Sequence, residues 1–254
     1  VVNDVCKELG LKIDDIDPHH ESIYTALACL QSPQGLFQIE AETNFKVCQL
    51  IKPQNLEQLS AVVAIARPGA LDFKDDYAAY VRTGESQSVD AFFDDILSYT
   101  GGIPLYQEQL MQMAVKVGFS LDESEQLRRI IGKKKVDQMP AWKAKIDQKV
   151  QENNLDSKVG EILWKVAEDS ANYSFNKSHS ISYAYLAAIT IYLKFNYPEQ
   201  FFLSLLKYTK FEPNSHEEIA KISQELPHFN IELLPPDLNL SLIHISEPTR
   251  RTPI

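Results

Sequence analysis

The sequence predicts a mainly α-helical fold with minor β structure. Three observations favour this class: apolar residues recur at helical spacing along most of the chain, capping residues precede several of these segments, and the apolar segment 181–195 suits a buried helix. Strand signals are few, at residues 36–39 and at 231–234 before Pro235 and Pro236. The 254 residues allow one large domain or two small ones.

Helical segments fill the N-terminal part of the chain and are separated by loops of turn-forming residues. Asn55 is a candidate N-cap, and Arg67-Pro68-Gly69 ends the helix that follows it. The expected helices lie at residues 1–9, 22–31, 41–50, 56–66, 73–83 and 89–99. This regular succession of helices leaves little room for a sheet.

Start and stop signals are stronger in the rest of the chain. Further helices are expected at residues 106–117, 121–131, 181–195 and 199–208, and after Asp156 and Ser215. The signals are a capping box at Ser120 and Glu123, a terminal glycine at Gly132, an N-cap at Asp156, a first-turn Pro198, and a capping box at Ser215 and Glu218.

Composition excludes several classes of protein. No apolar run approaches the roughly 20 residues that span a membrane, and no basic segment followed by an apolar core marks a secretory signal. Cys6, Cys29 and Cys48 are odd in number and lack metal-ligand spacing, which predicts reduced thiols in a cytoplasmic protein.

One short segment is strongly basic although the protein as a whole is acidic. Residues 128–149 hold eight Lys or Arg and two Asp, a net charge of +6, so the other residues sum to −16 within the total of −10. Such an island predicts a specific phosphate contact. Taken alone, the island fits a solvated helical face better, because that is the more common outcome for a charge run.

Two groups of cations lie at the start of this island. Arg128 and Arg129 occupy the last turn of a predicted helix and offer planar, bidentate donors to phosphate. Lys133, Lys134 and Lys135 follow the helix as mobile point charges. The alternative is that these cations only compensate the helix dipole.

A second polar motif precedes the apolar helix. Asn176, Lys177, Ser178 and His179 supply an amide, an ammonium, a hydroxyl and an imidazole at a helix N-terminus, where unpaired N–H groups bind anions. His179 is a candidate general acid toward pyrophosphate. Ordinary capping by Asn176 or Ser178 is the alternative.

The third motif offers an aromatic ring and amides at a helix start. Tyr106 could stack on a sugar or base and Gln109 could hydrogen-bond to it, although a buried tyrosine is the alternative. Arg67 adds a cation in a turn.

The acidic residues suggest no metal site. The acidic clusters at residues 14–17, 75–76 and 94–95 do not follow a strong strand, so we expect surface acids rather than a two-metal centre. His19 and His20 lack partners at ligand spacing.

The order and spacing of these motifs resemble the fingers region of the C-family bacterial replicative DNA polymerases, the family of the DNA polymerase III alpha subunit. The matching segments are 35–40, 66–71, 106–109, 127–129, 132–135, 175–179, 184–185, 193–194, 197–201 and 234–239. The resemblance implies a multi-helix fingers region at residues 35–239, preceded at 1–34 by the tail end of the palm or a connecting segment.

The resemblance also implies roles for residues. The incoming nucleotide and template-primer would face Arg128, Arg129, Asn176, Lys177 and His179, with Tyr106 and Gln109 also at the nucleotide. DNA would be bound by Lys133, Lys134, Lys135 and Arg67. Members of the family are DNA-directed DNA polymerases, so the resemblance implies Mg²⁺ as the metal and deoxynucleoside triphosphates and a DNA template-primer as substrates. It also implies a sliding clamp and other replicase subunits as partners.

By the same resemblance, the catalytic aspartates of the palm lie upstream of Val1, so the segment is not expected to polymerise alone. The alternative function is a non-catalytic α-helical module that binds nucleic acid or protein. Convergence of the motifs in space would discriminate between the two.

The last residues resemble something other than a natural protein. Residues 240–250 read like the in-frame translation of a sequencing-library adapter. We therefore expect residues 240–254 to be a non-native tail with few contacts to the rest of the chain.

Overall fold

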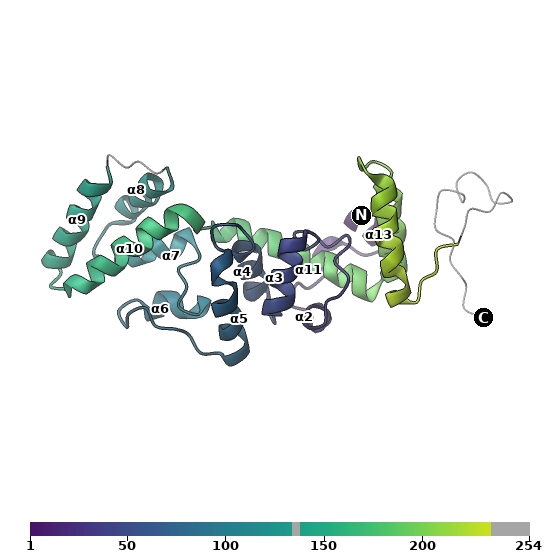
Figure 1. Ribbon diagram of the computed structural model, residues 1–254, viewed down its shortest axis with the longest axis horizontal. Coiled ribbons are helices and arrows are strands. Elements are labelled where there is room, and N and C mark those ends of the chain that lie inside the picture. Colours follow the sequence, from purple (N-terminus) through teal and green to yellow (C-terminus); the bar gives the residue numbers. More distant parts are fainter. Residues whose placement is uncertain (134–137, 235–254) are drawn as a thin grey trace. The chain divides into compact units, whose positions relative to one another are not determined.

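The computed structural model describes residues 1–133 and 138–234, without the side chains of Asn172 and Tyr173 (Figure 1). Over these residues the chain forms α-helices and short 3-10 helices and no strand. Its one β-type pairing there is an isolated parallel bridge between Tyr106 and Phe175. The expected mainly α-helical class is confirmed.

The chain divides into two compact units. Unit 1 comprises Val1–Phe45 together with the chain from Tyr185 onward, and unit 2 comprises Lys46–Ala184. Helices α3 (Glu42–Ile51) and α11 (Lys177–Asn196) each pass from one unit to the other along the chain. The domain limits expected at 1–34 and 35–239 refer to regions of a polymerase and stay predictions, and the tail 240–254 lies outside the described residues.

Unit 2 contains a four-helix bundle. Helices α7 (Gln107–Val117), α8 (Leu121–Gly132), α9 (Met139–Glu152) and α10 (Ser157–Tyr173) pack against one another around Leu110, Met113, Leu127, Ile146, Leu163 and Ala167. The other helices of unit 2 are α4 (Leu56–Ile65), η2 (Leu71–Phe73), α5 (Lys74–Thr83), α6 (Asp94–Leu97) and η3 (Ser98–Thr100).

Three of the helix starts in unit 2 follow the predicted side-chain caps. Asn55 Oδ1 accepts the Gln58 N–H before α4, and Asp156 Oδ1 accepts the Lys158 N–H before α10. At α8, Ser120 and Glu123 form the expected reciprocal pair of hydrogen bonds. These caps satisfy N–H groups that a helix leaves unpaired at its first turn.

Unit 1 is built on the second half of α11. Its helices are α1 (Val2–Leu9), η1 (Ile13–Asp15), α2 (Glu21–Ala28), α12 (Pro198–Thr209), α13 (Ser215–Glu225) and η4 (Leu226–Phe229). One apolar cluster joins α1, α11 and α12 through Val5, Leu193 and Phe201, and another joins α12, α13 and η4 through Phe202, Ile222 and Leu226.

Burial was expected for residues 181–195 and is found mainly along the second half of α11, whereas Ser182 is exposed and Ile181 and Tyr183 are partly exposed. Ala187, Ile189 and Leu193 are each no more than 1% exposed. No helix among the described residues is long and apolar enough to cross a membrane.

Some local expectations were wrong. Residues 36–39 form a turn rather than a strand. Leu36 and Ile39 are buried, and Gln38 has a positive φ of 60°, which interrupts an extended path. Residues 231–234, the other expected strand, are irregular.

Two expected helix signals also differ from the structure. Ser215 lies inside α13, which begins after Asn214 without a side-chain cap. Helix α8 includes Gly132 as its last residue and is followed by Lys133 as its C-cap, so Gly132 is not a left-handed cap.

Candidate functional site

The start of helix α7 and the start of helix α11 lie side by side. The Gln107 N–H donates to the Phe175 carbonyl at 2.9 Å, and the Phe175 N–H donates to the Leu105 carbonyl at 3.2 Å. This short parallel pairing holds the segment before α11 against the first turn of α7. Two motifs that are far apart in sequence, 106–109 and 175–179, therefore share one location in unit 2.

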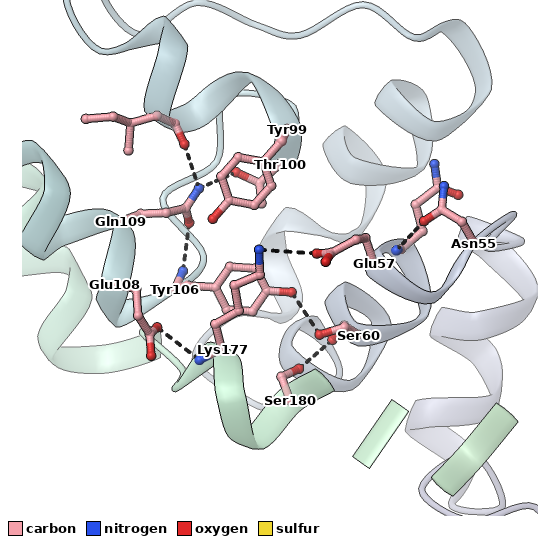
Figure 2. Close-up of polar contacts among 12 residues, drawn as sticks. Asn55, Glu57, Ser60, Tyr99, Thr100, Tyr106, Glu108, Gln109, Lys177 and Ser180 are labelled. Carbon is pink, nitrogen blue, oxygen red and sulfur yellow. Dashed lines mark hydrogen bonds and ion pairs between the residues drawn. The ribbon is translucent and has the colours of Figure 1, made fainter. Parts of the chain in front are cut away.

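Glu108 joins these two helix starts through both of its carboxylate oxygens. Oε1 accepts Asn176 Nδ2 at 2.8 Å, and Oε2 accepts the Lys177 backbone N–H at 2.9 Å. Figure 2 shows the second of these bonds. Asn176 Oδ1 in turn accepts the His179 N–H at 2.8 Å, which makes Asn176 the N-cap of α11.

The arginine motif reaches the same place from α8. Arg128 donates through an Nη to Gln107 Oε1 at 3.0 Å, so the residue that precedes Glu108 anchors the arginine. A second residue of α8, Glu125, receives a two-pronged contact from Arg128 through Nε and the other Nη, each at 2.6 Å. These bonds bring the three motifs together around the first turn of α7.

Glu125 also binds the second arginine. Arg129 Nε donates to Glu125 Oε1 at 2.7 Å. The two guanidinium groups, Arg128 first, hold the pKa of the Glu125 carboxyl at about 2, and Glu125 raises the pKa of Arg128. One carboxylate thus keeps two like charges next to each other on one helix turn.

The two arginines differ in availability. The Arg128 side chain is 30% exposed and the Arg129 side chain 64% exposed. Among hydrogen bonds to described residues, Arg129 uses only its Nε–H, whereas Arg128 uses Nε and both Nη groups. Because a guanidinium carries several N–H donors, Arg129 is the better placed of the two to accept an additional anion.

Lys177 lies in an aromatic and acidic environment (Figure 2). Its Nζ is 3.3 Å from Glu57 Oε2, 4.5 Å from the Tyr99 ring centroid and 5.7 Å from the Tyr106 ring centroid. The ammonium is therefore held near the N-terminal turn of α11 by a carboxylate and two π-faces.

His179 and Arg67 lie against the same aromatic ring. The Arg67 Cζ is 4.0 Å from the Phe175 ring centroid, and the His179 ring is 5.5 Å from that ring and 4.0 Å from Tyr183. Arg67 and His179 are both exposed. Together they form a cationic and aromatic surface beside the first turns of α11.

Tyr106 and Gln109 are internal. The Tyr106 side chain is 1% exposed, its hydroxyl is 3.2 Å from Ser60 Oγ, and burial raises its pKa. Ser180 Oγ donates to the Ser60 carbonyl at 2.7 Å, which ties α11 to α4 next to this tyrosine.

Gln109 has its hydrogen-bonding groups engaged. Its Oε1 accepts the Tyr106 N–H at 2.9 Å, and its Nε2 donates to Thr100 Oγ1 at 2.7 Å and to the Ile96 carbonyl at 3.2 Å (Figure 2). A direct nucleotide contact by Tyr106 or Gln109 stays a prediction. In the structure, both residues stabilise the start of α7 through these hydrogen bonds.

The remaining predicted residues are only partly described. Lys133 is exposed directly after α8, whereas Lys134 and Lys135 lie outside the described residues. No group of three or more His, Cys, Asp or Glu side chains in the described part of the chain could hold a metal ion. The three cysteines are free thiols, with Cys6 and Cys48 buried and Cys29 exposed.

Sequence reasoning gave no role to the three carboxylates that organise the site. The spacing of Glu125 to Arg128 and Arg129, at i+3 and i+4, is a readable helix-pair signal. The contacts of Glu108 with Asn176 and of Glu57 with Lys177 join residues distant in sequence and have no local signal.

Comparison with known proteins identifies the family of this chain. The chain belongs to the family of bacterial DNA polymerase III alpha subunit finger domains, whose profile matches residues 1–154. The DNA polymerase III subunit alpha of Halalkalibacterium halodurans is 34% identical over 232 residues, which cover 91% of this chain and 20% of that protein.

Two other relatives match similarly. The Treponema pallidum subunit is 34% identical over 237 residues, 92% of this chain and 20% of that protein. The Thermus aquaticus subunit is 34% identical over 215 residues, 82% of this chain and 17% of that protein. The chain thus spans about a fifth of the length of the curated relatives it matches.

Proposed function

We propose that this chain is the nucleotide-binding fingers portion of a DNA-directed DNA polymerase. The parent enzyme transfers a nucleotidyl group from a deoxynucleoside triphosphate to the 3′ end of a primer. The observation that supports this function is the meeting of the α8 arginines, the first turn of α7 and the first turn of α11 in one part of unit 2. This convergence, with the family membership, favours the polymerase over a non-catalytic module that binds nucleic acid or protein.

The chemistry of phosphoryl transfer needs such a cluster. Negative charge on the departing pyrophosphate must be neutralised as the bond to the α-phosphate breaks, and positioned cations supply most of that stabilisation. Arg129 is our first candidate for this contact because its side chain is the more exposed of the two arginines. Arg128 precedes it on α8 and shares the Glu125 carboxylate with it, and both Arg128 and Lys177 have part of their donor capacity already used.

Other residues would serve the nucleotide or the DNA. His179 is exposed at the first turn of α11 and can donate a hydrogen bond or a proton toward pyrophosphate. Asn176, a nucleotide contact expected from the sequence, lies at the same turn but already donates its amide to Glu108. Arg67 and Lys133 are proposed contacts to the DNA backbone, with Lys134 and Lys135 continuing that stretch.

We place the Mg²⁺ ligands of the parent enzyme outside the described residues. The family implies Mg²⁺, but the described residues offer no suitable cluster of ligands, so we assign no metal ligand and no catalytic carboxylate to them. We propose that these groups belong to another part of the parent enzyme, and that the present chain does not polymerise alone. The proposed partners are a DNA template-primer, deoxynucleoside triphosphates, a sliding clamp and other replicase subunits in the bacterial cytoplasm.

The test is to replace one arginine in the full-length polymerase that contains this chain. Arg129→Ala removes charge-assisted hydrogen bonds to the nucleotide, each worth about 1.5–3 kcal/mol. We expect a nucleotide Kd about 10- to 150-fold weaker in single-turnover incorporation. Primer-template affinity should change little, because DNA binding is spread over many phosphates.

Lys143→Ala is the control because this lysine lies on α9 within the same basic island but outside the matched motifs. It should leave the nucleotide Kd unchanged. Arg128→Ala should resemble Arg129→Ala, with additional loss of thermal stability, since it also removes the bond to Gln107. Equal loss of DNA affinity in all three variants, without a change in nucleotide dependence, would replace this proposal by a plain DNA-binding surface.

A further inference from the structure

The first turn of α11 is fixed by two hydrogen-bond acceptors from different elements. Asn176 Oδ1 accepts the His179 N–H from within the same segment, and Glu108 Oε2 accepts the Lys177 N–H from α7. These bonds satisfy two of the N–H groups that a helix start leaves unpaired. The carboxylate also lies where the positive end of the helix dipole stabilises a negative charge.

Glu108 fixes the orientation of the Asn176 side chain as well. An asparagine amide has an oxygen that accepts and a nitrogen that donates. To cap the helix, Asn176 Oδ1 must accept the His179 N–H. The amide nitrogen Nδ2 then points the other way and needs a hydrogen-bond acceptor. Glu108 Oε1 is that acceptor, at 2.8 Å. The carboxylate and the cap therefore depend on each other.

The same first turn of α7 also holds the arginine motif. Gln107, adjacent to Glu108, accepts from Arg128 Nη. A displacement of the start of α11 relative to α7 would thus change the distance between the arginines and the residues Lys177 and His179. Triphosphate binding depends on that distance, since all of these groups would have to reach one ligand.

We propose that Glu108 is a positioning residue for nucleotide binding: through Asn176 and the Lys177 N–H it holds the first turn of α11 in register with the arginines of α8. This inference rests on the proposed nucleotide site. It gives Asn176 the role of a capping link between Glu108 and His179, in place of the direct nucleotide contact expected from the sequence.

A reversal of hydrogen-bond direction tests this role. In Glu108→Gln, the new amide can accept from the Lys177 N–H, but its NH₂ group then faces Asn176 Nδ2, a second donor. Flipping the Asn176 amide repairs that contact and breaks the cap at His179, so one bond is lost in either arrangement.

The double variant Glu108→Gln/Asn176→Asp restores the pattern of donors and acceptors. The introduced glutamine accepts from the Lys177 N–H through its oxygen and donates through its NH₂ group to the introduced aspartate. That aspartate accepts from the His179 N–H with its other oxygen. All three bonds return, and the net charge of the double variant equals that of the wild type.

The measurement is single-turnover incorporation by the full-length polymerase that contains this chain, with primer-template Kd and thermal midpoint measured in parallel. Glu108→Gln should weaken the nucleotide Kd about 10-fold, with primer-template Kd unchanged within about 2-fold. The double variant should return the nucleotide Kd to within about 3-fold of wild type. Glu161→Gln, at an exposed acid on α10, is the charge-matched control and should behave as wild type.

Two outcomes would overturn the inference. One is a nucleotide Kd for Glu108→Gln that equals that of Glu161→Gln. The other is a double variant that binds nucleotide no better than Glu108→Gln, which would mean that the Asn176 amide acts on the nucleotide directly. If Glu108→Gln does not fold, a folded double variant with wild-type nucleotide Kd supports the inference, and a folded double variant with weakened Kd overturns it.

Arg129→Ala in the same series separates this inference from the proposed function. If Arg129→Ala binds nucleotide normally, the nucleotide site itself is wrong. If Arg129→Ala is impaired while Glu108→Gln is not, only the positioning role of Glu108 fails.

Discussion

Lys194 is the most deeply buried charged side chain described in unit 1. Its side chain is inaccessible to solvent, and its Nζ donates to the carbonyls of Ser32 and Gln34, each at 2.7 Å, and to Glu225 Oε2 at 2.9 Å. Glu225 Oε1 accepts the Gln34 N–H. The lysine therefore ties α11, α13 and the loop after α2 together, and burial lowers its pKa to about 8 despite the carboxylate.

Lys194→Met should lower the free energy of unfolding by about 3–5 kcal/mol, because it leaves the Glu225 carboxylate and two carbonyls buried without their donor. Lys194→Met/Glu225→Gln should recover most of that loss, since the amide still accepts from Gln34 and no charge is left unpaired. Urea denaturation at neutral pH measures both. A single variant as stable as wild type would show that the bonds to Lys194 contribute little.

The pH dependence has a defined sign. The folded-state pKa of Lys194, about 8, lies below the unfolded value of 10.5, so the unfolded chain binds more protons between these values. Stability from this residue therefore rises as pH increases from about 8 to 10.5. In urea denaturation repeated at pH values from about 8 to 10.5, the advantage of wild type over Lys194→Met should grow with pH.

At the scale of elements, the connection between η3 and α7 requires a glycine at position 102. Gly102 has φ of +88°, and a Cβ there would lie 1.7 Å from the Gln87 carbonyl oxygen. Gly102→Ala should therefore destabilise the protein by about 2 kcal/mol or more, through both strain and steric conflict. Gly132 has no atom within 4 Å of the added methyl and lies in α8, so Gly132→Ala should be neutral or stabilising by up to about 1 kcal/mol. Thermal unfolding of the pair tests this difference.

Local chemistry predicted several helix starts. The Ser120 and Glu123 box and the Asn55 cap join residues within one helical turn, so spacing indicated their partners. The same spacing at Ser215 and Glu218 misled, because α13 begins one residue earlier, after Asn214. Residues 36–39 misled because two buried apolar residues in a turn give the same short pattern as a strand.

The site could be predicted only in part for a related reason. The cations were visible as motifs, but their partners Glu57 and Glu108 come from other elements and are specified by tertiary packing. An aromatic ring and an amide at a helix start have the same sequence pattern whether they are exposed or buried, so the sequence could not predict the burial of Tyr106 and Gln109. Their contact with the nucleotide stays a prediction.

For the whole molecule, the described apolar clusters follow the division into two units. The bundle core of unit 2 is formed by α6 to α10, whereas the clusters of unit 1 join α1, the second half of α11, α12 and α13. The proposed nucleotide site belongs to unit 2, and the Lys194 network belongs to unit 1. Each unit thus has its own apolar core. A substitution in the proposed nucleotide site alters unit 2, and a substitution in the Lys194 network alters unit 1.

We expect this chain to unfold in two calorimetric transitions, one for each unit, because separate cores need not melt together. A deoxynucleoside triphosphate that binds only folded unit 2 should raise one transition, by about 2.7 kcal/mol of stability at a concentration about 100 times its Kd. Lys194→Met should lower the other transition. Arg129→Ala should reduce the nucleotide-induced stabilisation to about 0.3–1.4 kcal/mol at the same nucleotide concentration, without moving the transition of unit 1. A single transition that shifts as a whole in every case would show that the two units unfold cooperatively and that their cores are not energetically separate.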